Sequence, residues 1–206
     1  MFITLEGGEG TGKSTQVKLL AERFRAEGRT FLTTREPGGT PEAEALRTLL
    51  VSGDINRWTA NEELLLNFAA RSSHIRHVIQ PALAKGQVVI CDRFVDSSFV
   101  YQVVAGGADQ QLFAALIGAV AREPVPHFTF ILDIDAGLGA ARAKARMVDA
   151  KDTAENRFER KGEAFHQKVR NAFAEIAKQQ HKRCHLIDAT GSTKDVADRI
   201  WAKLNG

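Results

Sequence analysis

The sequence has few of the features that identify secreted, membrane-bound or nucleic-acid-binding proteins. Its two cysteines, Cys91 and Cys184, lie far apart with no second cysteine or histidine at metal-ligand spacing, so neither a disulfide framework nor a zinc site is indicated. The longest run without a charged residue is 12, short of the ~20 apolar residues that a bilayer crossing needs. The net charge of +3 is too small to indicate a polyanionic partner. We therefore expect a cytoplasmic protein that binds neither membranes nor nucleic acids.

No internal repeat, low-complexity tract or linker interrupts the chain, so we expect a single domain over residues 1–206. Short apolar runs alternate with longer stretches of helical spacing, and the runs that we expect as strands are Phe2–Leu5, Thr30–Thr34, Val88–Cys91, Phe128–Leu132 and Cys184–Ile187. All but the run at Thr30, an edge candidate, are apolar almost throughout, as parallel strands covered on both faces are. The pattern predicts an open α/β fold, in which ligands bind at the carboxyl ends of the strands.

The stretches between these runs carry helix signals. Thr40 and Pro41 combine a capping residue with a proline at the first helical position, and Thr59 with Glu62 forms a capping-box pattern, as does Ser192 with Asp195. The apolar stripes at helical spacing are Val17, Leu20, Ala21 and Phe24; Leu112, Leu116, Ala119 and Val120; Phe165, Val169, Phe173 and Ile176; and Val196, Ile200 and Leu204. Each stripe predicts a helix with one buried face.

A phosphate-binding loop follows the first expected strand. The pattern of Gly, four residues and Gly-Lys-Ser/Thr is matched by Gly7, Gly8, Glu9, Gly10, Thr11, Gly12, Lys13, Ser14 and Thr15. The preceding strand and following helix are the context that the loop needs, because backbone N–H groups and the helix N-terminus attract phosphates. We expect Lys13 to neutralise the β- and γ-phosphates of ATP and the Ser14 hydroxyl to ligate Mg²⁺. By itself the loop leaves open a kinase, a GTPase or an ATPase motor.

Charged residues stand where other ligand contacts are expected. Glu9 is an acid within a loop that attracts phosphate, so it either faces a hydroxyl or metal-bound water or simply tolerates a solvent-exposed position. After the third expected strand, Asp92 can help to hold Mg²⁺ and Arg93 can clamp a phosphate, unless the two form a surface ion pair. The turn-rich segment Thr34–Thr40 is either a connection or a rigid wall for the phosphate acceptor.

Two segments, Ile90–Gln102 and Thr34–Thr40, resemble signatures of the thymidylate kinase family in its bacterial form, and the resemblance extends over essentially the whole chain. It implies a P-loop nucleoside monophosphate kinase fold, with a five-stranded parallel sheet flanked by helices and a mobile lid. The implied reaction is direct transfer of the ATP γ-phosphoryl group to dTMP with Mg²⁺, giving dTDP and ADP. The resemblance also implies a homodimer.

The resemblance assigns substrate contacts position by position. Arg93 takes the position that grips the dTMP phosphate, and Glu9 the position that contacts the sugar 3′-hydroxyl or the metal shell. Phe68 and Arg71 lie on one helical face and match an aromatic residue that stacks on thymine and an arginine that hydrogen-bonds the base. From its apolar stripe alone, Phe68 is interpreted as a core residue. The other implied dTMP contacts are Glu36, Pro37, Ser97, Ser98 and Gln102, together with Tyr101 beside C2′.

A polar, arginine-bearing segment over about 142–162 is expected to form the lid. The phosphate loop has no arginine before Lys13, so the arginine that stabilises the transferring phosphoryl group must come from elsewhere. The resemblance points to Arg146 and Arg157, and the alternative is a solvated basic helix face. The chain departs from the family pattern in an insertion at 149–153 and in segment 103–107, which lacks the usual arginine.

Two other functions remain as alternatives at this stage. One is a kinase for another deoxynucleoside or deoxynucleotide, which would differ in the base pocket formed by Phe68, Arg71 and Ser98. The other is a P-loop ATPase that regulates a partner. The sequence argues against this alternative, because it has neither an Asn-Lys-x-Asp guanine motif nor a basic stripe.

Overall fold

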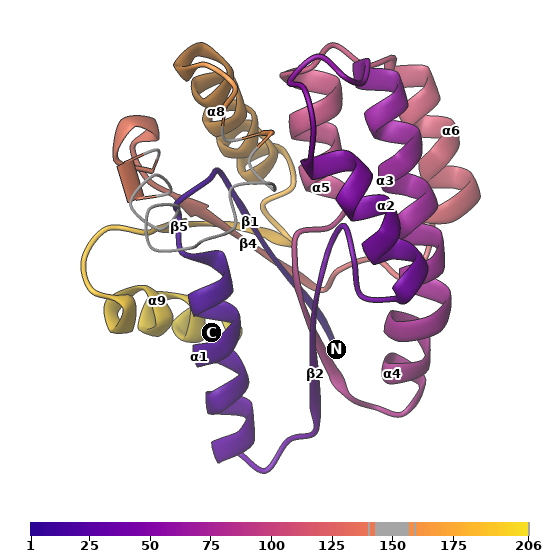
Figure 1. Cartoon of the computed structure of the whole chain (residues 1–206). Helices are drawn as coiled ribbons and strands as arrows, with labels where there is room; N and C mark the ends of the chain where they lie inside the picture. The colour runs from indigo at the N-terminus through magenta and orange to yellow at the C-terminus, as the bar shows by residue number, and fades with distance from the viewer. Residues whose placement is uncertain (140, 143–156, 159, 206) are drawn as a thin grey trace.

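The computed structural model describes residues 1–139, 141–142, 157–158 and 160–205 (Figure 1). At its centre is a five-stranded parallel sheet in the order β2-β3-β1-β4-β5. The strands are β1 (Phe2–Gly7), β2 (Phe31–Arg35), β3 (Val88–Asp92), β4 (Phe128–Asp133) and β5 (Cys184–Asp188). All five expected strands are confirmed, and β2 is an edge strand as predicted.

Each strand continues one or two residues beyond its expected end, into polar sequence. In the case of β1 and β3, pairing extends to Leu5 opposite Asp92, while β1 pairs with β4 as far as Gly7 opposite Leu132. Charged residues that follow the apolar runs are therefore fixed by the hydrogen-bonded ladder rather than carried on loops. This places chemistry-bearing side chains at the carboxyl edge of the sheet.

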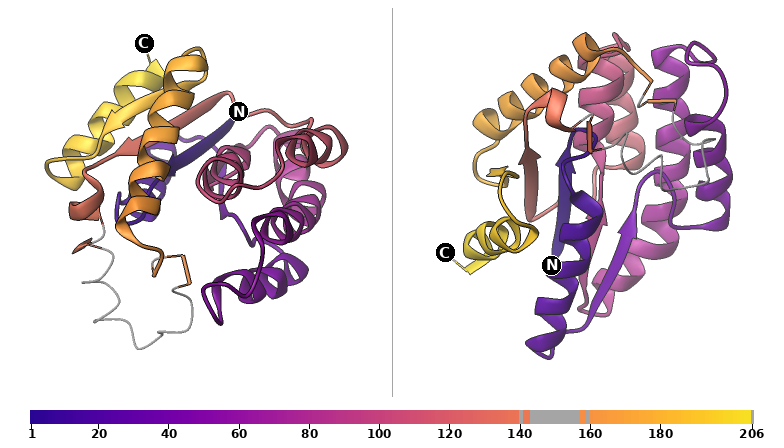
Figure 2. Two further views of the ribbon diagram at one scale, coloured as in Figure 1. Left: turned by 90° about the horizontal axis from the view of Figure 1, so that it is seen from above. Right: turned by 60° about the vertical axis from the view of Figure 1, so that its left-hand side comes forward.

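Helices cover both faces of the sheet (Figures 1 and 2). On one face, α1 (Lys13–Ala26) and α9 (Thr193–Asn205) bury apolar stripes against strands β1, β3, β4 and β5. On the other face lie helices that bury Phe2, Val89 and Ile131. These are α3 (Ala60–His74), the π-helical η1 (Ile75–Ile79), α4 (Gln80–Ala84), α5 (Val95–Ser98), the π-helical η2 (Phe99–Val104), α6 (Gln110–Val120) and α8 (Glu163–Gln179), with α2 (Pro41–Val51) packed on α3.

The expected caps are confirmed. The Thr40 hydroxyl accepts from the Ala43 N–H at the start of α2, and both capping boxes form, Thr59 with Glu62 and Ser192 with Asp195. One stripe needs correction: in α6 Ala119 is exposed, and the other stripe residues are only half-buried. The main contacts of α6 are with α3 and η2, and its half-buried residues pack at the margin of the cluster around Phe2 and Val89.

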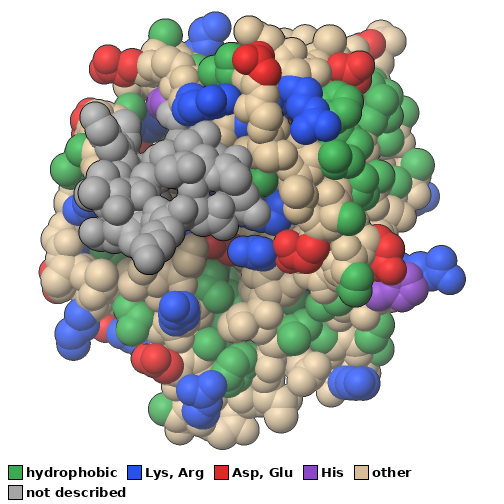
Figure 3. All heavy atoms as spheres, viewed as in Figure 1, with side chains coloured by type: hydrophobic (Ala, Val, Ile, Leu, Met, Phe, Trp, Pro, Cys, Tyr) green, Lys and Arg blue, Asp and Glu red, His purple; other side chains and the backbone are tan. Residues whose placement is uncertain are grey.

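No helix within the described ranges is long and apolar enough to cross a membrane. On the face seen in Figure 3, basic side chains alternate with acidic ones instead of forming a stripe. Most of the expected lid, including Arg146 and the insertion at 149–153, lies outside the described residues.

Candidate active site

The phosphate loop joins the end of β1 to the start of α1 at the carboxyl edge of the sheet. The Lys13 ammonium donates to the carbonyl oxygens of Gly7 (3.1 Å) and Gly8 (2.7 Å), which holds it inside the turn. Gly10 has a φ of 71°, and a Cβ at this position would clash with the backbone of Gly139, so the loop requires glycine there. Burial and the positive charge of Arg93 lower the pKa of Lys13 to about 8, although neighbouring carboxylates oppose this.

A cleft of about 170 Å³ lies over this loop. Its lining residues are Glu9, Gly10, Gly12, Lys13, Ser14, Arg35, Glu36, Arg47, Asp92 and Arg93. Arg35 and Asp92 are the last residues of β2 and β3, Arg47 lies within α2, and the other lining residues come from loops or from the start of α1. Lys13, Arg35, Arg47 and Arg93 make the cleft suitable for a polyphosphate.

Ser14 and Asp92 form the pair expected to bind Mg²⁺. The Ser14 hydroxyl donates to Asp92 Oδ2 across 2.9 Å, and both residues line the cleft. Two hard oxygen donors beside a phosphate loop suit Mg²⁺, which usually keeps several waters and takes its remaining ligands from substrate phosphates. Within the described ranges no group of three or more His, Cys, Asp or Glu residues could hold a metal, so the fit depends on this pair.

Arg93 has a backbone conformation that is unusual for a residue with a side chain. Its φ of 71° lies in the left-handed region, and it is the sole non-glycine residue with positive φ in the described part of the chain. The guanidinium Nη2 donates to Glu9 Oε1 (2.7 Å) and to the Tyr101 hydroxyl (3.2 Å). Nη1 donates to Ser97 Oγ and to the Gly7 carbonyl, both at 3.1 Å. The turn therefore aims the guanidinium across the phosphate loop.

Glu9 faces this arginine rather than open solvent. Burial alone would raise the pKa of Glu9, but the charges of Arg93 and Lys13 outweigh it and lower the pKa to about 2. Tyr101 also donates to Glu9 Oε1 (3.2 Å), and burial raises the pKa of this phenol. Glu9 is therefore a carboxylate at neutral pH and can accept a hydrogen bond from a substrate hydroxyl.

A second cavity, also of about 170 Å³, adjoins the phosphate cleft. The two share Glu9, Glu36, Arg47 and Arg93 as lining residues. The second cavity is also lined by Pro37, Leu50, Val51, Asn67, Arg71, Phe94, Ser97, Ser98, Tyr101, Gln102 and Phe158. All but one of the expected dTMP contacts are brought together here.

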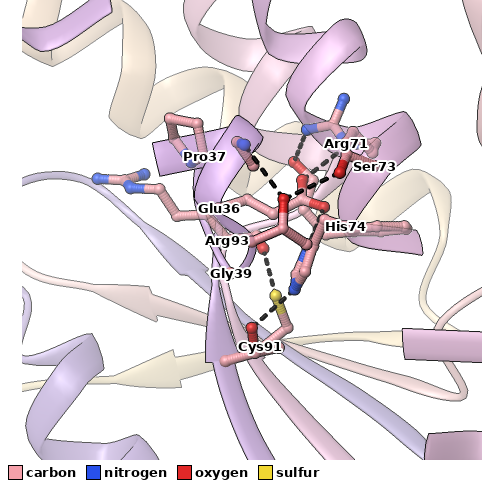
Figure 4. A network of polar contacts seen from close by, with 12 residues as sticks. Glu36, Pro37, Gly39, Arg71, Ser73, His74, Cys91 and Arg93 are labelled. Atoms are coloured by element: carbon pink, nitrogen blue, oxygen red, sulfur yellow. Dashed lines mark hydrogen bonds and ion pairs between the residues drawn. The ribbon is translucent and has the colours of Figure 1, made fainter. Parts of the chain in front are cut away.

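Arg71 lines this second cavity and is held in place by a buried ion pair with Glu36 (Figure 4). Its Nε donates to Glu36 Oε2 (2.7 Å), and Nη2 donates to Ser98 Oγ (3.0 Å) and the Phe94 carbonyl (3.1 Å). His74, one turn later on α3, contacts the other oxygen of Glu36 at 2.9 Å. Arg71 Nη1 is buried and has no hydrogen-bond partner among the described residues, so it is a donor that a ligand can satisfy.

Phe68 is the expected contact that does not line the cavity, which corrects its assignment as a base-stacking residue. It is 1% exposed and packs edge-on against Phe113, with ring centroids 5.8 Å apart. The Arg71 guanidinium lies over its ring at 4.5 Å, so Phe68 supports Arg71 from behind. The neighbouring Asn67 faces the cavity instead and donates through Nδ2 to the Glu63 carbonyl (2.8 Å). The sequence offered one indication of this: Asn67 lies four residues before Arg71, and residues four apart lie on the same face of a helix.

Arg157 also differs from expectation, because its guanidinium is directed away from the phosphate loop. Nη2 donates to Glu63 Oε1 (2.5 Å), Nη1 to the Leu50 carbonyl (3.0 Å) and Nε to the Asp54 carbonyl (3.0 Å). The residue is 1% exposed and does not line the phosphate cleft. Sequence reasoning missed Glu63, which follows Glu62 in the first turn of α3 and has no local signal that separates it from that neighbour.

Donor and acceptor cavities that meet at an arginine, on a P-loop α/β sheet, define a P-loop nucleoside monophosphate kinase. The family model described as thymidylate kinase matches residues 5–200, and the chain belongs to this family. It is 50% identical over 199 residues to the thymidylate kinase of Caulobacter vibrioides, covering 97% of this chain and 93% of the relative. For the thymidylate kinase of Afipia carboxidovorans the identity is 46% over 203 residues, covering 98% and 88%.

A solved structure agrees with this result. The crystal structure of thymidylate kinase from Ehrlichia chaffeensis matches with a TM-score of 0.78 and 33% sequence identity, covering 99% of this chain and 98% of that one. The expected fold is thereby confirmed: a P-loop nucleoside monophosphate kinase with a five-stranded parallel sheet flanked by helices.

Proposed function

We propose that this protein transfers the γ-phosphoryl group of ATP to the phosphate of dTMP, giving ADP and dTDP. Membership of the thymidylate kinase family supports the reaction and the acceptor. The observation that carries the proposal is the pair of cavities that meet at Arg93, one lined by the phosphate loop and the other by Arg71. Because this arrangement brings two phosphates together, positioning and charge neutralisation supply the rate.

The donor phosphates occupy the cleft over residues 7–15 in this proposal. Backbone N–H groups of the loop and the N-terminus of α1 face the phosphates, and Lys13 exchanges its carbonyl contacts for phosphate oxygens. Ser14 and Asp92 hold Mg²⁺, which when bound neutralises charge on the donor phosphates. The acceptor is already a phosphate anion, so no general base is needed.

The acceptor lies with its phosphate on Arg93 and its base toward Arg71. Glu9 accepts from the sugar 3′-hydroxyl, and Tyr101 covers the sugar beside C2′, which disfavours a ribose hydroxyl. Arg71 Nη1 donates to a base carbonyl and so gains the partner that it lacks. Asn67, Ser98 and Gln102 provide amide and hydroxyl groups for the base edge, with Pro37 and Ser97 completing the cavity wall.

Arg146 remains our proposed source of the positive charge that stabilises the transferring phosphoryl group, within a lid over about 142–162. Arg157 is assigned a different role below, because its three nitrogens are already engaged.

We also propose that the protein is a homodimer. Support comes from α6, whose apolar residues are at most half-buried, and from Leu65 on the neighbouring α3, which is 47% exposed. Light scattering on the purified protein tests this proposal, and a monomer at micromolar concentration would reject it. The cytoplasmic location expected from the sequence stays a prediction.

A coupled assay with ATP, Mg²⁺ and a panel of acceptors tests the function. We expect rapid ADP release with dTMP, less with dUMP, and little with dCMP, dGMP or thymidine. Phosphorylation of thymidine but not of dTMP would indicate a nucleoside kinase. ATP hydrolysis that rises with DNA or a protein partner, and not with dTMP, would indicate a regulatory ATPase.

A further inference from the structure

Glu63 is a buried carboxylate that connects two parts of the site. It lies in the first turn of α3, and its side chain is 2% exposed. One oxygen, Oε1, accepts from Arg157 Nη2 at 2.5 Å, and the other, Oε2, accepts from Gln102 Nε2 at 3.0 Å. Gln102 lines the acceptor cavity from η2. A single carboxylate therefore joins α3, the wall of the acceptor cavity and Arg157, which lies near the C-terminal end of the expected lid.

Arg157 is fixed by more than this ion pair. Its other guanidinium nitrogens donate to the carbonyls of Leu50 and Asp54, and its backbone N–H donates to the Val51 carbonyl at 3.1 Å. These acceptors lie at the C-terminal end of α2 and just beyond it. Arg157 thus satisfies carbonyls at the end of α2, Leu50 through its guanidinium and Val51 through its backbone N–H, and it shares the Asp54 carbonyl with the Arg57 N–H.

The position of Arg157 determines where Phe158 lies. Phe158 lines the acceptor cavity and packs edge-on against Tyr101, with ring centroids 6.1 Å apart. Leu50 and Val51, whose carbonyls hold Arg157, line the same cavity. The ion pair thereby positions two side chains in the lining of the cavity: the apolar ring of Phe158 and the polar amide of Gln102.

We propose that Glu63 and Arg157 are positioning residues for the acceptor nucleotide. Their buried pair seats Phe158 against Tyr101 and holds Gln102 in the cavity wall, so its loss weakens acceptor binding more than it slows phosphoryl transfer. A buried ion pair commonly adds little net stability relative to apolar residues of similar size, which favours a geometric role for this one. The inference rests on the proposed function, since it takes dTMP as the acceptor.

Steady-state kinetics on four variants test the proposal: Glu63→Gln, Arg157→Gln, the double variant and Phe158→Ala. We expect each single substitution to raise the KM for dTMP at least tenfold, with kcat within threefold and the KM for ATP within twofold of the wild type. The double variant should raise the KM for dTMP no more than the larger single effect, because both residues act through one pair. Arg25→Gln is the matched control, since Arg25 is exposed on α1 and lines neither cavity.

Single substitutions break the buried pair and can prevent folding, although in Arg157→Gln the Lys161 ammonium still lies 3.8 Å from Glu63 Oε1. The double variant removes both charges, and Phe158→Ala leaves the pair intact. If Glu63→Gln and Arg157→Gln do not fold, these two variants test the proposal. A kcat reduced a hundredfold at unchanged KM for dTMP in the Arg157 variants would overturn the proposal, as would unchanged kinetics in both the double variant and Phe158→Ala. Absence of dTMP phosphorylation by the wild type would instead reject the proposed function.

Discussion

Arg93 and Glu9 form an ion pair across 2.7 Å at the junction of the two cavities. Both residues line both cavities, so in the proposed reaction the pair stands where the phosphoryl group passes from donor to acceptor. The ion pair also keeps the guanidinium in place before substrate arrives. Arg93 therefore needs little rearrangement to bind an acceptor phosphate.

Replacing Arg93 by lysine is expected to lower kcat/KM for dTMP by about 10²-fold or more, as removal of a preorganised transition-state donor does. Lysine keeps the charge but cannot donate from two nitrogens to Glu9 and Ser97 at once. Steady-state kinetics with dTMP provide the measurement, and Arg199→Lys is the control because Arg199 lines neither cavity and donates to the Asp188 and Thr190 carbonyls. Activity above half of the wild-type value in Arg93→Lys would contradict the assignment.

Asn67 and Phe68 give a matched pair of substitutions on adjacent residues. Asn67→Ala is expected to raise the KM for dTMP about fivefold, the effect of losing ~1 kcal/mol of hydrogen bonding. Phe68→Leu is expected to lower the free energy of unfolding by about 1 kcal/mol while leaving that KM within threefold, since the ring lies behind Arg71. The reverse pattern in kinetics and urea melts would restore Phe68 as the base-stacking residue.

Lys13 makes donor binding dependent on pH. Because burial and Arg93 lower its pKa to about 8, free Lys13 loses its charge as the pH rises through 8. The affinity for ATP is therefore expected to fall between pH 7 and pH 9 in calorimetric titrations. Lys13→Arg should bind ATP with a flatter pH profile, because arginine stays protonated. Equal slopes in the two proteins would show that another group governs the dependence.

Glu6 makes stability dependent on pH. Burial, followed by the negative charge of Asp96, raises the pKa of Glu6 from 4.5 to about 8, although Ser97 and the Phe94 N–H donate to it. Below pH 4.5 both the folded and unfolded states hold the proton; between pH 4.5 and 8 only the folded state does, so the contribution of Glu6 to stability falls as the pH rises. Glu6→Gln lacks this titrating group, so the difference in unfolding free energy, variant minus wild type, should increase from pH 5 to pH 8.5. A constant difference in urea melts at the two pH values would contradict the raised pKa.

Features encoded in neighbouring residues were predictable from the sequence. The strands, the caps at Thr40 and Thr59 and the phosphate loop depend on local pattern, and the structure places them as expected. The side of α3 that faces the cavity was not predictable, because one residue along a helix turns the side chain by about 100° and both Asn67 and Phe68 lie close to Arg71 in sequence. The acid partner of Arg157 could not be predicted either, since Glu63 is 94 residues away and no local pattern links them.

The buried contacts of Glu36 likewise could not be predicted from the sequence. Its partners Arg71 and His74 both come from α3, and Gly39 provides room for the His74 ring because a Cβ there would clash with it. Sequence patterns indicated an acid at the end of a strand, but they did not indicate which cations would meet it. That information comes from the packing of α3 against the loop after β2.

A crystal structure with dTMP and a non-hydrolysable ATP analogue tests the central claim most directly. The claim predicts the dTMP phosphate within hydrogen-bond distance of the Arg93 guanidinium and a thymine carbonyl on Arg71 Nη1, with the ATP phosphates on Lys13. A thymine ring turned away from Arg71, or dTMP bound outside the cavity that Arg71 lines, would contradict it.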